Sequence, residues 1–455
     1  MAKKKEKTLE EKLQEALVPE NQWPYILPEN WCWTRLENIN KYRGKSVTPQ
    51  NNDDILFELY SVPSCENEYP EILTGSKIGS SKQLVEKKDV LLCKINPRIN
   101  RVWQVLEYTN NTLLASSEWI VVRNRLLNSD YLVWYFKSPY FRECMLSNVS
   151  GVGGSLMRAK PKAVMEYPVP LAPLSEQKRI VNRIESLFAK LDEAKEKIQQ
   201  VLDGAEMRKA AILHKAFTGE LTKTWRKENG ISEDSWEVKK LSDCGNWYGG
   251  GTPSKTHPEY WEKGNILWIT SKDMKSDYIE DSQQHINSYG VENSSAKYIE
   301  EHALICVMRS GILRHSFPVA VIKKPFTVNQ DLKVLVPNKM INIEYLLFIC
   351  KYKEQSILNS CMKNGTTVES INFDKLKNFS IMIPAEIEQI RIVNIIKKFL
   401  CRENDVLNKC NKFITSIATM KKSILAKAFR GELGTNNPTE DSAFNLLKEV
   451  LQDKS

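Results

Sequence analysis

The sequence predicts an α+β protein in which two mixed α/β domains alternate with two long helices. The helices are expected to pair as an antiparallel coiled coil and to give the chain an internal repeat with pseudo-two-fold symmetry. Three observations predict this fold. The phrase HKAFTGEL at 214–221 returns as AKAFRGEL at 426–433, with six of the eight letters identical. Each copy closes a heptad pattern, and a similar order of short apolar runs precedes each helix.

The repeated unit is longer than the phrase, because EQKRIVNRI at 176–184 aligns with EQIRIVNII at 388–396 at the same spacing of 212 residues. Apolar side chains recur in each copy at steps of four and three, which predicts a helix with one apolar seam. The seam positions are Ile180, Ile184, Leu187, Leu191 and Ile198 in the first copy and Ile392, Ile396, Phe399, Val406, Phe413 and Ile417 in the second. Each seam has one polar break, Arg208 in the first copy and Glu403 in the second.

Signals at both ends bound the two helices. Pro173 and Pro384 precede their starts, and Gly219 and Gly431 suit their ends because glycine accepts a left-handed backbone. About 42 residues at 1.5 Å per residue gives each helix a length of roughly 63 Å. A stripe of that length must be buried, and the other copy is the expected partner. The alternative is two independent amphipathic helices, each packed on its own domain.

The segments before the helices are related more weakly. LLCKINPRINR at 91–101 corresponds to LICVMRSGILR at 304–314, and DYLVWYF at 130–136 corresponds to EYLLFIC at 344–350. Apolar runs bounded by Gly, Pro, Asn or Ser and followed by a helix predict mixed α/β domains. The predicted boundaries are an N-terminal extension at 1–30, a domain at 31–173, a helix at 174–221, a second domain with its linker at 222–384, a helix at 385–433 and a tail at 434–455. We expect the extension and the tail to meet near the first domain.

Composition excludes several classes of protein. The net charge of +9, with 42% hydrophobic and 27% charged residues, is typical of a globular chain with a mild preference for a polyanionic partner. Ten cysteines without a C-x-x-C pair, and five histidines that do not cluster with them, argue against a metal site or a disulfide framework. No apolar window is long enough for a membrane span. We therefore expect a reduced, cytoplasmic protein.

Some motifs are similar to catalytic ones but lack essential parts. GVGGS at 151–155 and GGGTPSKT at 249–256 do not have the spacing of a phosphate-binding loop, and we interpret them as flexible loops that allow close approach. INPRI at 95–99 carries the Asn-Pro pair of adenine methyltransferase active sites, but Arg98 follows where those sites need a second proline and an aromatic residue. No Ser-His-Asp set or paired carboxylates are recognisable. We predict that the chain alone is not an enzyme.

Two divergent α/β domains alternating with two EQ-x-RIV helices resemble the specificity (S) subunit of type I restriction–modification systems. The motifs that carry the resemblance are PLSEQKRIVNRI at 173–184, HKAFTGELT at 214–222, EQIRIVNII at 388–396 and AKAFRGELG at 426–434. Together they are specific, and the resemblance covers nearly the whole chain. The second copy departs from the first by reading PAEIEQ at 384–389 before its helix.

The resemblance implies that each domain is a target recognition domain, which reads one half of a bipartite sequence in double-stranded DNA. It implies that the helices are spacers that dock DNA methyltransferase (modification) subunits, two of them, together with restriction and motor subunits. No cofactor belongs to this chain; S-adenosylmethionine, ATP and Mg are expected in the partner subunits, which perform adenine N6 methylation and cleavage. Two alternatives remain, a stand-alone two-headed DNA-binding regulator and a coiled-coil scaffold with protein-binding domains.

Candidate DNA-contacting residues are polar or basic and lie mainly at the corresponding tips of the two domains, since Arg suits guanine and Asn or Gln suits adenine. They are Lys77, Lys94, Asn96, Arg98, Arg101 and Ser116 in the first domain and Arg309, Ser310, Arg314, His315, Asn329 and Gln330 in the second. Arg98 and Arg309 head this set. For partner docking we favour the recurring polar residues Glu176, Gln177, Arg179, Glu388, Gln389 and Arg391 on the exposed side of the helices. The alternative for them is a helix N-terminal cap, where glutamate suits the helix dipole.

Overall fold

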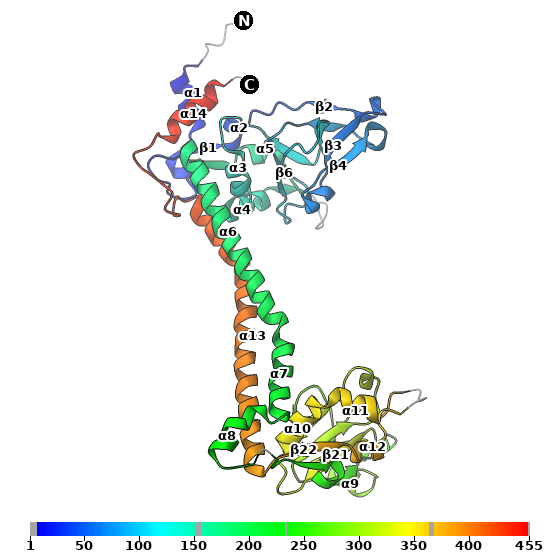
Figure 1. The fold of residues 1–455 in the computed structure, drawn as a ribbon. Coiled ribbons are helices and arrows are strands. Elements are labelled where there is room, and N and C mark those ends of the chain that lie inside the picture. Colours follow the sequence, from blue (N-terminus) through cyan, green and yellow to red (C-terminus); the bar gives the residue numbers. More distant parts are fainter. Residues whose placement is uncertain (1–6, 151–156, 233, 364–367, 454–455) are drawn as a thin grey trace. The chain divides into compact units, whose positions relative to one another are not determined.

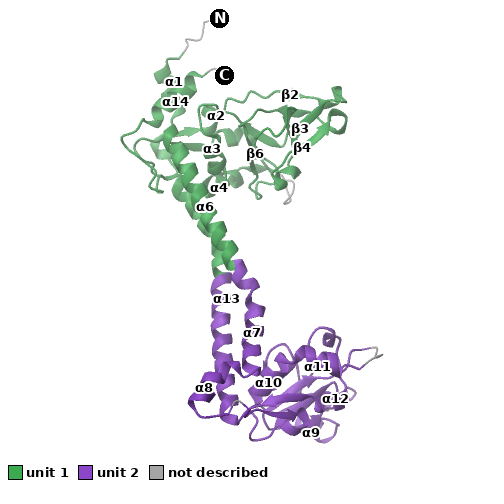
Figure 2. Ribbon diagram, viewed as in Figure 1, with its two compact units in different colours: residues 1–198, 412–455 green, residues 199–411 purple. Residues whose placement is uncertain are grey.

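The structure, a computed structural model, describes residues 7–150, 157–232, 234–363 and 368–453 (Figure 1). Contacts divide the chain into two compact units (Figure 2). Unit 1 combines residues 1–198 with 412–455, and unit 2 contains residues 199–411. The C-terminal segment therefore folds into the same unit as the N-terminal segment.

Among its described residues, unit 1 contains two larger sheets and two short two-stranded ones. Its sheet strands are β1 (Cys32–Arg35), β2 (Ser46–Val47), β3 (Leu56–Tyr60), β4 (Glu71–Thr74), β5 (Lys82–Leu84), β6 (Val90–Cys93), β7 (Val102–Gln104), β8 (Thr112–Ala115), β9 (Trp119–Val122) and β12 (Pro168–Leu171). Five strands form a sheet in the order β2-β5-β8-β3-β4, three form β7-β6-β9, and β1 pairs with β12. All four residues of β6 are buried, so β6 is the central strand next to the core.

The short helices of unit 1 share an apolar cluster with the three-stranded sheet β7-β6-β9. They are α2 (Leu36–Ile39), α3 (Ser129–Phe136), α4 (Pro139–Ser147) and α5 (Pro161–Met165), and a hairpin of β10 (Val149–Ser150) and β11 (Arg158–Ala159) lies between α4 and α5. The GVGGS loop lies outside the described residues.

The two ends of the chain complete the core of unit 1, as expected. Helix α1 (Leu9–Ala16) lies beside α14 (Ala443–Gln452) in Figure 1. Leu13 and Leu447 are buried in the same apolar cluster as the residues of β6 and α3. Thr8 caps α1 with a capping box, which fixes where that helix begins.

Unit 2 repeats the main elements of this plan in the same chain order. Its strands are β13 (Glu237–Lys240), β14 (Gly245–Gly249), β15 (Ile266–Ile269), β16 (Tyr278–Ile279), β17 (Gln284–Ile286), β18 (Ala303–Val307), β19 (Val319–Ile322), β20 (Phe326–Val328), β21 (Leu332–Pro337) and β22 (Ser380–Ile383). Its helices other than the long ones are α8 (Lys223–Glu228), α9 (Ser288–Glu292), α10 (Ile343–Tyr352), α11 (Glu354–Cys361) and α12 (Phe373–Lys377).

The sheet order of unit 2 matches unit 1 around the central strand. The buried strand β18 lies between β19 and β21, as β6 lies between β7 and β9, and β13 pairs with β22 as β1 pairs with β12. The five-stranded sheet has the order β14-β21-β18-β19-β16, and β17-β15-β20 form a further sheet. This matching order confirms that the two weakly related segments share a mixed α/β plan.

The first long helix is broken, which the sequence did not predict. It consists of α6 (Leu174–Asp203) and α7 (Ala205–Phe217), whereas the second, α13 (Glu386–Ala428), is continuous for 43 residues. The break falls at Gly204, where ψ is −3°. Glycine is, after proline, the residue least favourable to a helix interior, so the break occurs there. Gly219 and Gly431 have φ of 79° and 75°, which confirms their left-handed role after the helix ends.

Within each unit, contacts join the long helices in antiparallel order. In unit 1, Lys421 Nζ of α13 lies 2.7 Å from Asp192 Oδ1 of α6. In unit 2, Arg208 of α7 pairs with Glu403 of α13. Glu176 also contacts Thr435 in unit 1, and Arg226 also contacts Glu388 in unit 2. In each unit, therefore, residue numbers rise along one helix as they fall along the other.

The seam is buried mainly near the domains. Ile180, Ile184, Ile392 and Ile396 are fully buried because domain helices also cover them. Ile417 is buried as well. The half-buried seam residues are Leu187, Leu191, Ile198, Phe399 and Phe413. Val406 is 41% exposed, since a pair of helices covers a seam from one side only.

Candidate nucleic-acid interface

The repeated Glu-Gln pair at the start of each long helix joins that helix to its domain. Gln177 Nε2 donates to Ala172 O at 2.8 Å, and Gln177 Oε1 accepts from Asn128 N at 3.0 Å. Gln389 makes the same two bonds, to Pro384 O at 2.8 Å and from Asn342 N at 2.8 Å. Asn128 and Asn342 are the N-caps of α3 and α10, so each glutamine orients the start of a domain helix.

Each glutamate of these pairs accepts hydrogen bonds from the segment that follows the other long helix. Glu176 accepts from Thr435 Oγ1 at 3.3 Å and from Trp31 Nε1 at 2.7 Å. Glu388 accepts from Thr222 Oγ1 and from Arg226 Nη1, both at 2.5 Å. Thus the segment after Gly431 covers the first turn of α6, and the segment after Gly219 covers the first turn of α13.

The phenylalanine of each repeated phrase packs on a domain helix. Phe217 meets Tyr345 of α10 edge to face, with ring centroids 5.3 Å apart. Phe429 meets Tyr131 of α3 in the same way at 5.2 Å. The phrase occurs twice because each unit uses it in the same way, to fix a domain helix against the end of a long helix.

These contacts correct the prediction that the Glu-Gln pairs are exposed docking residues. Glu176 and Gln177 are fully buried, and Glu388 and Gln389 are each 1% exposed. They lie instead at the helix start, as the alternative interpretation had it. Glu176 and Glu388 are in the first turn of α6 and α13, where the helix dipole favours a negative charge. Arg179 holds Glu440 of the tail with two bonds of 2.8 and 2.9 Å. Arg391 lies over the Trp225 ring and remains exposed.

The tip of the first domain is the connection from β6 to β7, residues 94–101. The backbone of Lys94 and Asn96 binds the hairpin through Ala159 N (2.8 Å) and Met157 O (2.8 Å). Asn96 has φ of 46°, a left-handed turn that asparagine tolerates. The turn at Ser116 adjoins the tip, because Lys94 N donates to Glu118 O at 3.0 Å. A strand end, a turn and a hairpin thus form one surface.

The tip of the second domain is built in the same way after β18. Met308 N donates to Asp331 O at 2.8 Å, as Lys94 N does to Glu118 O. Arg309 forms a bridge with Ser370, and Ser310 N donates to Glu369 O at 3.1 Å, which ties the tip to the segment 368–371. Arg314 Nε donates to Glu369 Oε1 at 2.6 Å, and this guanidinium lowers the pKa of the Glu369 carboxyl.

Most of the predicted DNA-contacting residues lie on these two surfaces. Arg98 and Arg309 are exposed, and neither makes a side-chain hydrogen bond or ion pair with any part of the chain that the structure describes. Others are already engaged, as Arg314 is: Lys94 Nζ donates to Ser117 O at 2.6 Å, Arg101 pairs with Glu66 at 3.0 Å, and Gln330 accepts from Thr252. His315 and Ser310 lie at the second tip, and His315 is exposed.

Two predicted residues do not fit the surface. Lys77 is exposed but follows β4 in the five-stranded sheet, whereas the tip belongs to the three-stranded sheet. Asn329 is 8% exposed, and its Oδ1 accepts from Asp331 N at 3.2 Å. A contact between Asn329 and DNA would require that turn to open, so its structural role replaces the predicted one.

The structure adds residues that the sequence reasoning missed. Arg158 follows the glycine-rich loop and lies 3.3 Å from Glu118, beside Lys94. Arg142 Nη2 donates to Arg98 O at 2.7 Å and holds the tip in place. Glu369 does the same at the second tip. A basic residue three positions after GVGGS was a usable signal for Arg158, but no local pattern indicated Arg142 or Glu369.

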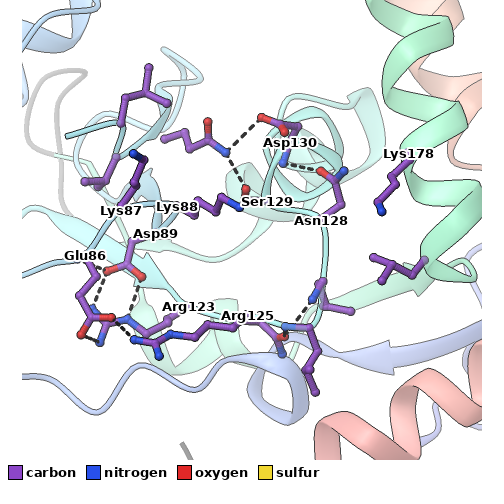
Figure 3. Close-up of a pocket in the computed structure, with 17 residues that line it drawn as sticks. Glu86, Lys87, Lys88, Asp89, Arg123, Arg125, Asn128, Ser129, Asp130 and Lys178 are labelled. Carbon is purple, nitrogen blue, oxygen red and sulfur yellow. Dashed lines mark hydrogen bonds and ion pairs between the residues drawn. The ribbon is translucent and has the colours of Figure 1, made fainter. Parts of the chain in front are cut away.

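A hollow of about 720 Å³ lies elsewhere in unit 1, beside α3 and the start of α6 (Figure 3). Its arginines are paired: Arg123 lies 2.6 Å from Asp89 and 2.8 Å from Glu86, and Arg125 lies 2.6 Å from Glu86. The hydrogen bond with Asp89 raises the pKa of Arg123 further. The hollow therefore belongs to the junction between domain and helix, and both of its arginines are already paired with carboxylates.

Among the described residues of the two tips, the geometry activates no reactive group. Cys93 precedes the first tip, but burial raises the pKa of its thiol to about 11, which keeps it protonated. Within the described ranges, no cluster of His, Cys, Asp and Glu could hold a metal ion. In the same part of the chain, no helix has the length and apolar character needed to cross a membrane.

Known proteins match parts of this chain at the level of sequence. Residues 233–415 match the family model described as the type I restriction modification DNA specificity domain. The specificity subunit of the type I restriction enzymes EcoR124I/EcoR124II of Escherichia coli is 40% identical over 176 residues, which cover 39% of this chain and 44% of that subunit. The EcoKI specificity subunit of E. coli K12 is 23% identical over 358 residues, 73% of each chain.

The fold is that of a solved relative. The crystal structure of the HsdS subunit from Thermoanaerobacter tengcongensis matches with a TM-score of 0.70 and 20% identity, covering 90% of this chain and 99% of that one. This match shows the fold, and the chain spans less than half the length of the EcoR124I/EcoR124II subunit that it matches. The second half of the chain thus matches the DNA specificity domain of type I restriction–modification systems, and longer parts of the chain are similar to specificity subunits of such systems.

Proposed function

We propose that this chain reads a bipartite sequence in double-stranded DNA, one half with each domain, and positions methyltransferase and restriction subunits on it. The observation that carries the proposal is the repeated tip: a buried central strand ends at the same kind of turn in both units. The frame recurs while the side chains at the tips differ, as Asn96 in one and Ser310 in the other illustrate. Two similar frames with different side chains suit two different short sequences.

We infer further that α6 and α7 together pair with α13 as one antiparallel coiled coil with pseudo-two-fold symmetry. The opposite helix directions within each unit and the matching Glu-Gln contacts support this arrangement. Such a pair would present the two tips in inverted orientation, as the antiparallel strands of a duplex require. B-DNA advances about 34 Å per turn of roughly 10 bp, so the helix length would set the gap between the halves.

The chemistry would belong to the partners. Two modification subunits would bring S-adenosylmethionine, and restriction and motor subunits would bring ATP and Mg. With the Glu-Gln pairs buried, docking must use other surfaces of the helices. Residues of α13 that are exposed near Trp225, such as Ile387 (64% exposed) and Arg391, are available for it.

Co-expression with a methyltransferase subunit, followed by mapping of methylated adenines, tests the proposal. The expected result is a motif of two short specified halves separated by an unspecified gap. Methylation at an uninterrupted motif would contradict the bipartite reading. A stand-alone regulator would instead bind DNA tightly without a methyltransferase, and a scaffold would show no salt-dependent affinity for DNA.

A further inference from the structure

We propose that the ion pair of Arg208 and Glu403 locks the break at Gly204, and that this lock restricts DNA recognition to one gap length. The inference rests on the proposed function for its biological meaning, but the lock itself is a property of unit 2. All of its residues lie between 199 and 411, so they belong to one compact unit.

The pair occupies the one position in each seam where the heptad pattern lacks an apolar residue. Arg208 Nε and Nη2 lie 3.0 and 2.5 Å from Glu403 Oε1. The Glu403 side chain is only 8% exposed, although nearby Val406 on the same helix is 41% exposed. The polar break of one helix therefore meets the polar break of the other. Polar groups of this kind in a helix seam are best known for fixing how two helices align.

The same guanidinium also crosses the break. Arg208 Nη2 donates to Val201 O at 2.8 Å, so it contacts the last turn of α6 from its place on α7. Helix α6 ends at Asp203 and α7 begins at Ala205, which puts Gly204 between the two groups that Arg208 joins. One side chain thus ties together α6, α7 and α13.

Glycine at the break makes room for this arrangement. A Cβ atom at Gly204 would lie 2.7 Å from Arg208 Nη1, which is closer than such atoms approach. A glycine in a helix is a point of bending. Here the Arg208 guanidinium occupies the space that a Cβ atom would take, and its bonds oppose the bending. Without the ion pair, α7 would be free to change its direction against α13 about Gly204.

The consequence is a positioning role. Helix α7 ends at Phe217, which packs on Tyr345 and Tyr352 of the second domain. A change in the direction of α7 therefore moves that domain. If the two domains read two halves of a target, a loose break would let the chain accept neighbouring gap lengths.

The test uses the full chain co-expressed with its methyltransferase and plasmids in which the two halves are separated by gaps one base pair shorter, unchanged or one longer. The variant is Arg208→Met with Glu403→Leu, which fills the seam with apolar groups so that the helices still pair. We expect its preference for the original gap to fall by about tenfold, the factor that 1.4 kcal/mol of lost restraint gives. Thermal unfolding should be unchanged or shifted upward.

Two further variants separate positioning from general damage. Glu403→Gln keeps an oxygen that accepts from Arg208, so it should keep the gap preference. Glu206→Ala with Lys209→Ala removes an ion pair of 2.8 Å within α7 that does not involve α13, and it should also keep the preference.

A readout without DNA keeps the lock testable. Spin labels placed one in each unit should give a broader distance distribution in the Arg208→Met, Glu403→Leu variant than in the wild type. An unchanged distribution together with an unchanged gap preference would overturn the proposal. Wild-type methylation of an unsplit motif would instead defeat the proposed function, while the distance distribution would still decide whether the lock exists.

Discussion

Gln177 and Gln389 show how one side chain can join a long helix to a domain. Each binds a backbone carbonyl just before its own helix and the backbone N–H of the asparagine that caps a domain helix. Both glutamines are buried, so water cannot replace these bonds. The same residue occurs at both positions because both positions make the same hydrogen bonds.

Gln389→Ala tests this role. The change leaves Asn342 N and Pro384 O without their partner in a buried setting, and we expect the free energy of unfolding to fall by about 2–3 kcal/mol. Urea denaturation measures it, and Lys398→Ala, an exposed position on the same helix, should change it by less than about 0.5 kcal/mol. Equal midpoints for the two variants would contradict the role.

The two buried glutamates should differ although they occupy the same repeat position. Glu388→Gln leaves the Arg226 guanidinium, 7% exposed, without its carboxylate and should cost about 3–5 kcal/mol. Glu176 instead meets a Trp N–H and a Thr hydroxyl, and burial raises its pKa. Glu176→Gln should therefore cost much less at neutral pH.

The raised pKa of Glu176 determines how the stability difference between the wild type and Glu176→Gln changes with pH. Because the folded-state pKa of Glu176 is above its unfolded value of about 4.3, the wild type loses stability as the pH rises from that value through the raised pKa. Glu176→Gln lacks this loss, so its stability relative to the wild type should increase over that range. Urea titrations at several pH values measure the difference, and a difference independent of pH would contradict the assignment.

Arg309→Ala tests the tip of the second domain. Arg309 is exposed and has no side-chain partner among the described residues, so its loss should spare folding. We expect recognition of one half-site to weaken by about 1–3 kcal/mol, which methylation of variant targets measures. Lys339→Ala, at the opposite end of β21, is the control. Equal loss for every target sequence would make Arg309 a phosphate contact.

Single residues were predictable where a strand end exposes them. Arg98 and Arg309 follow buried apolar strands, and the structure has them exposed at the tips. The burial of Glu176 and Asn329 was not predictable, because the residue type alone does not show whether a polar side chain faces solvent or lies in a buried turn. The residues that bury Glu176 come from the tail and from Trp31, far away in the sequence.

At the scale of elements, the heptad pattern predicted both long helices and their glycine ends. It missed the break at Gly204, since a single glycine within a helical pattern is often tolerated and gives no sign of its geometry. The pattern also could not show that the middle of the seam is only half-buried. Burial depends on how many elements cover a seam, and near the domains there are more.

Leu191→Pro tests the long helix as an element. Proline removes a backbone donor and clashes with the preceding turn, which costs about 3 kcal/mol or more. We expect a loss of helical circular dichroism and new proteolytic cleavage near residue 191. Leu191→Ala removes the same half-buried side chain without the backbone effect and is the matched control. Equal cleavage of both variants would show that no continuous helix passes through this position.

At the scale of the whole molecule, the internal repeat predicted two domains of one plan and the meeting of the chain ends. The repeat did not indicate the contacts that hold the chain end in place, such as Lys41 Nζ to Asp453 O at 2.6 Å. Those contacts join α14 to the first domain and depend on side chains that no repeat marks. The solved HsdS structure matches this fold over 90% of the chain.

The central claim is that each domain reads its own half of the target. The most direct measurement is an exchange of residues 31–170 for the matching segment of a relative with a different target, keeping a tryptophan at position 31 to bind Glu176. Methylated adenines are then mapped in cells that carry the methyltransferase. The account predicts that one half of the motif changes while the other half and the gap stay the same. A change in both halves, or in neither, would contradict it.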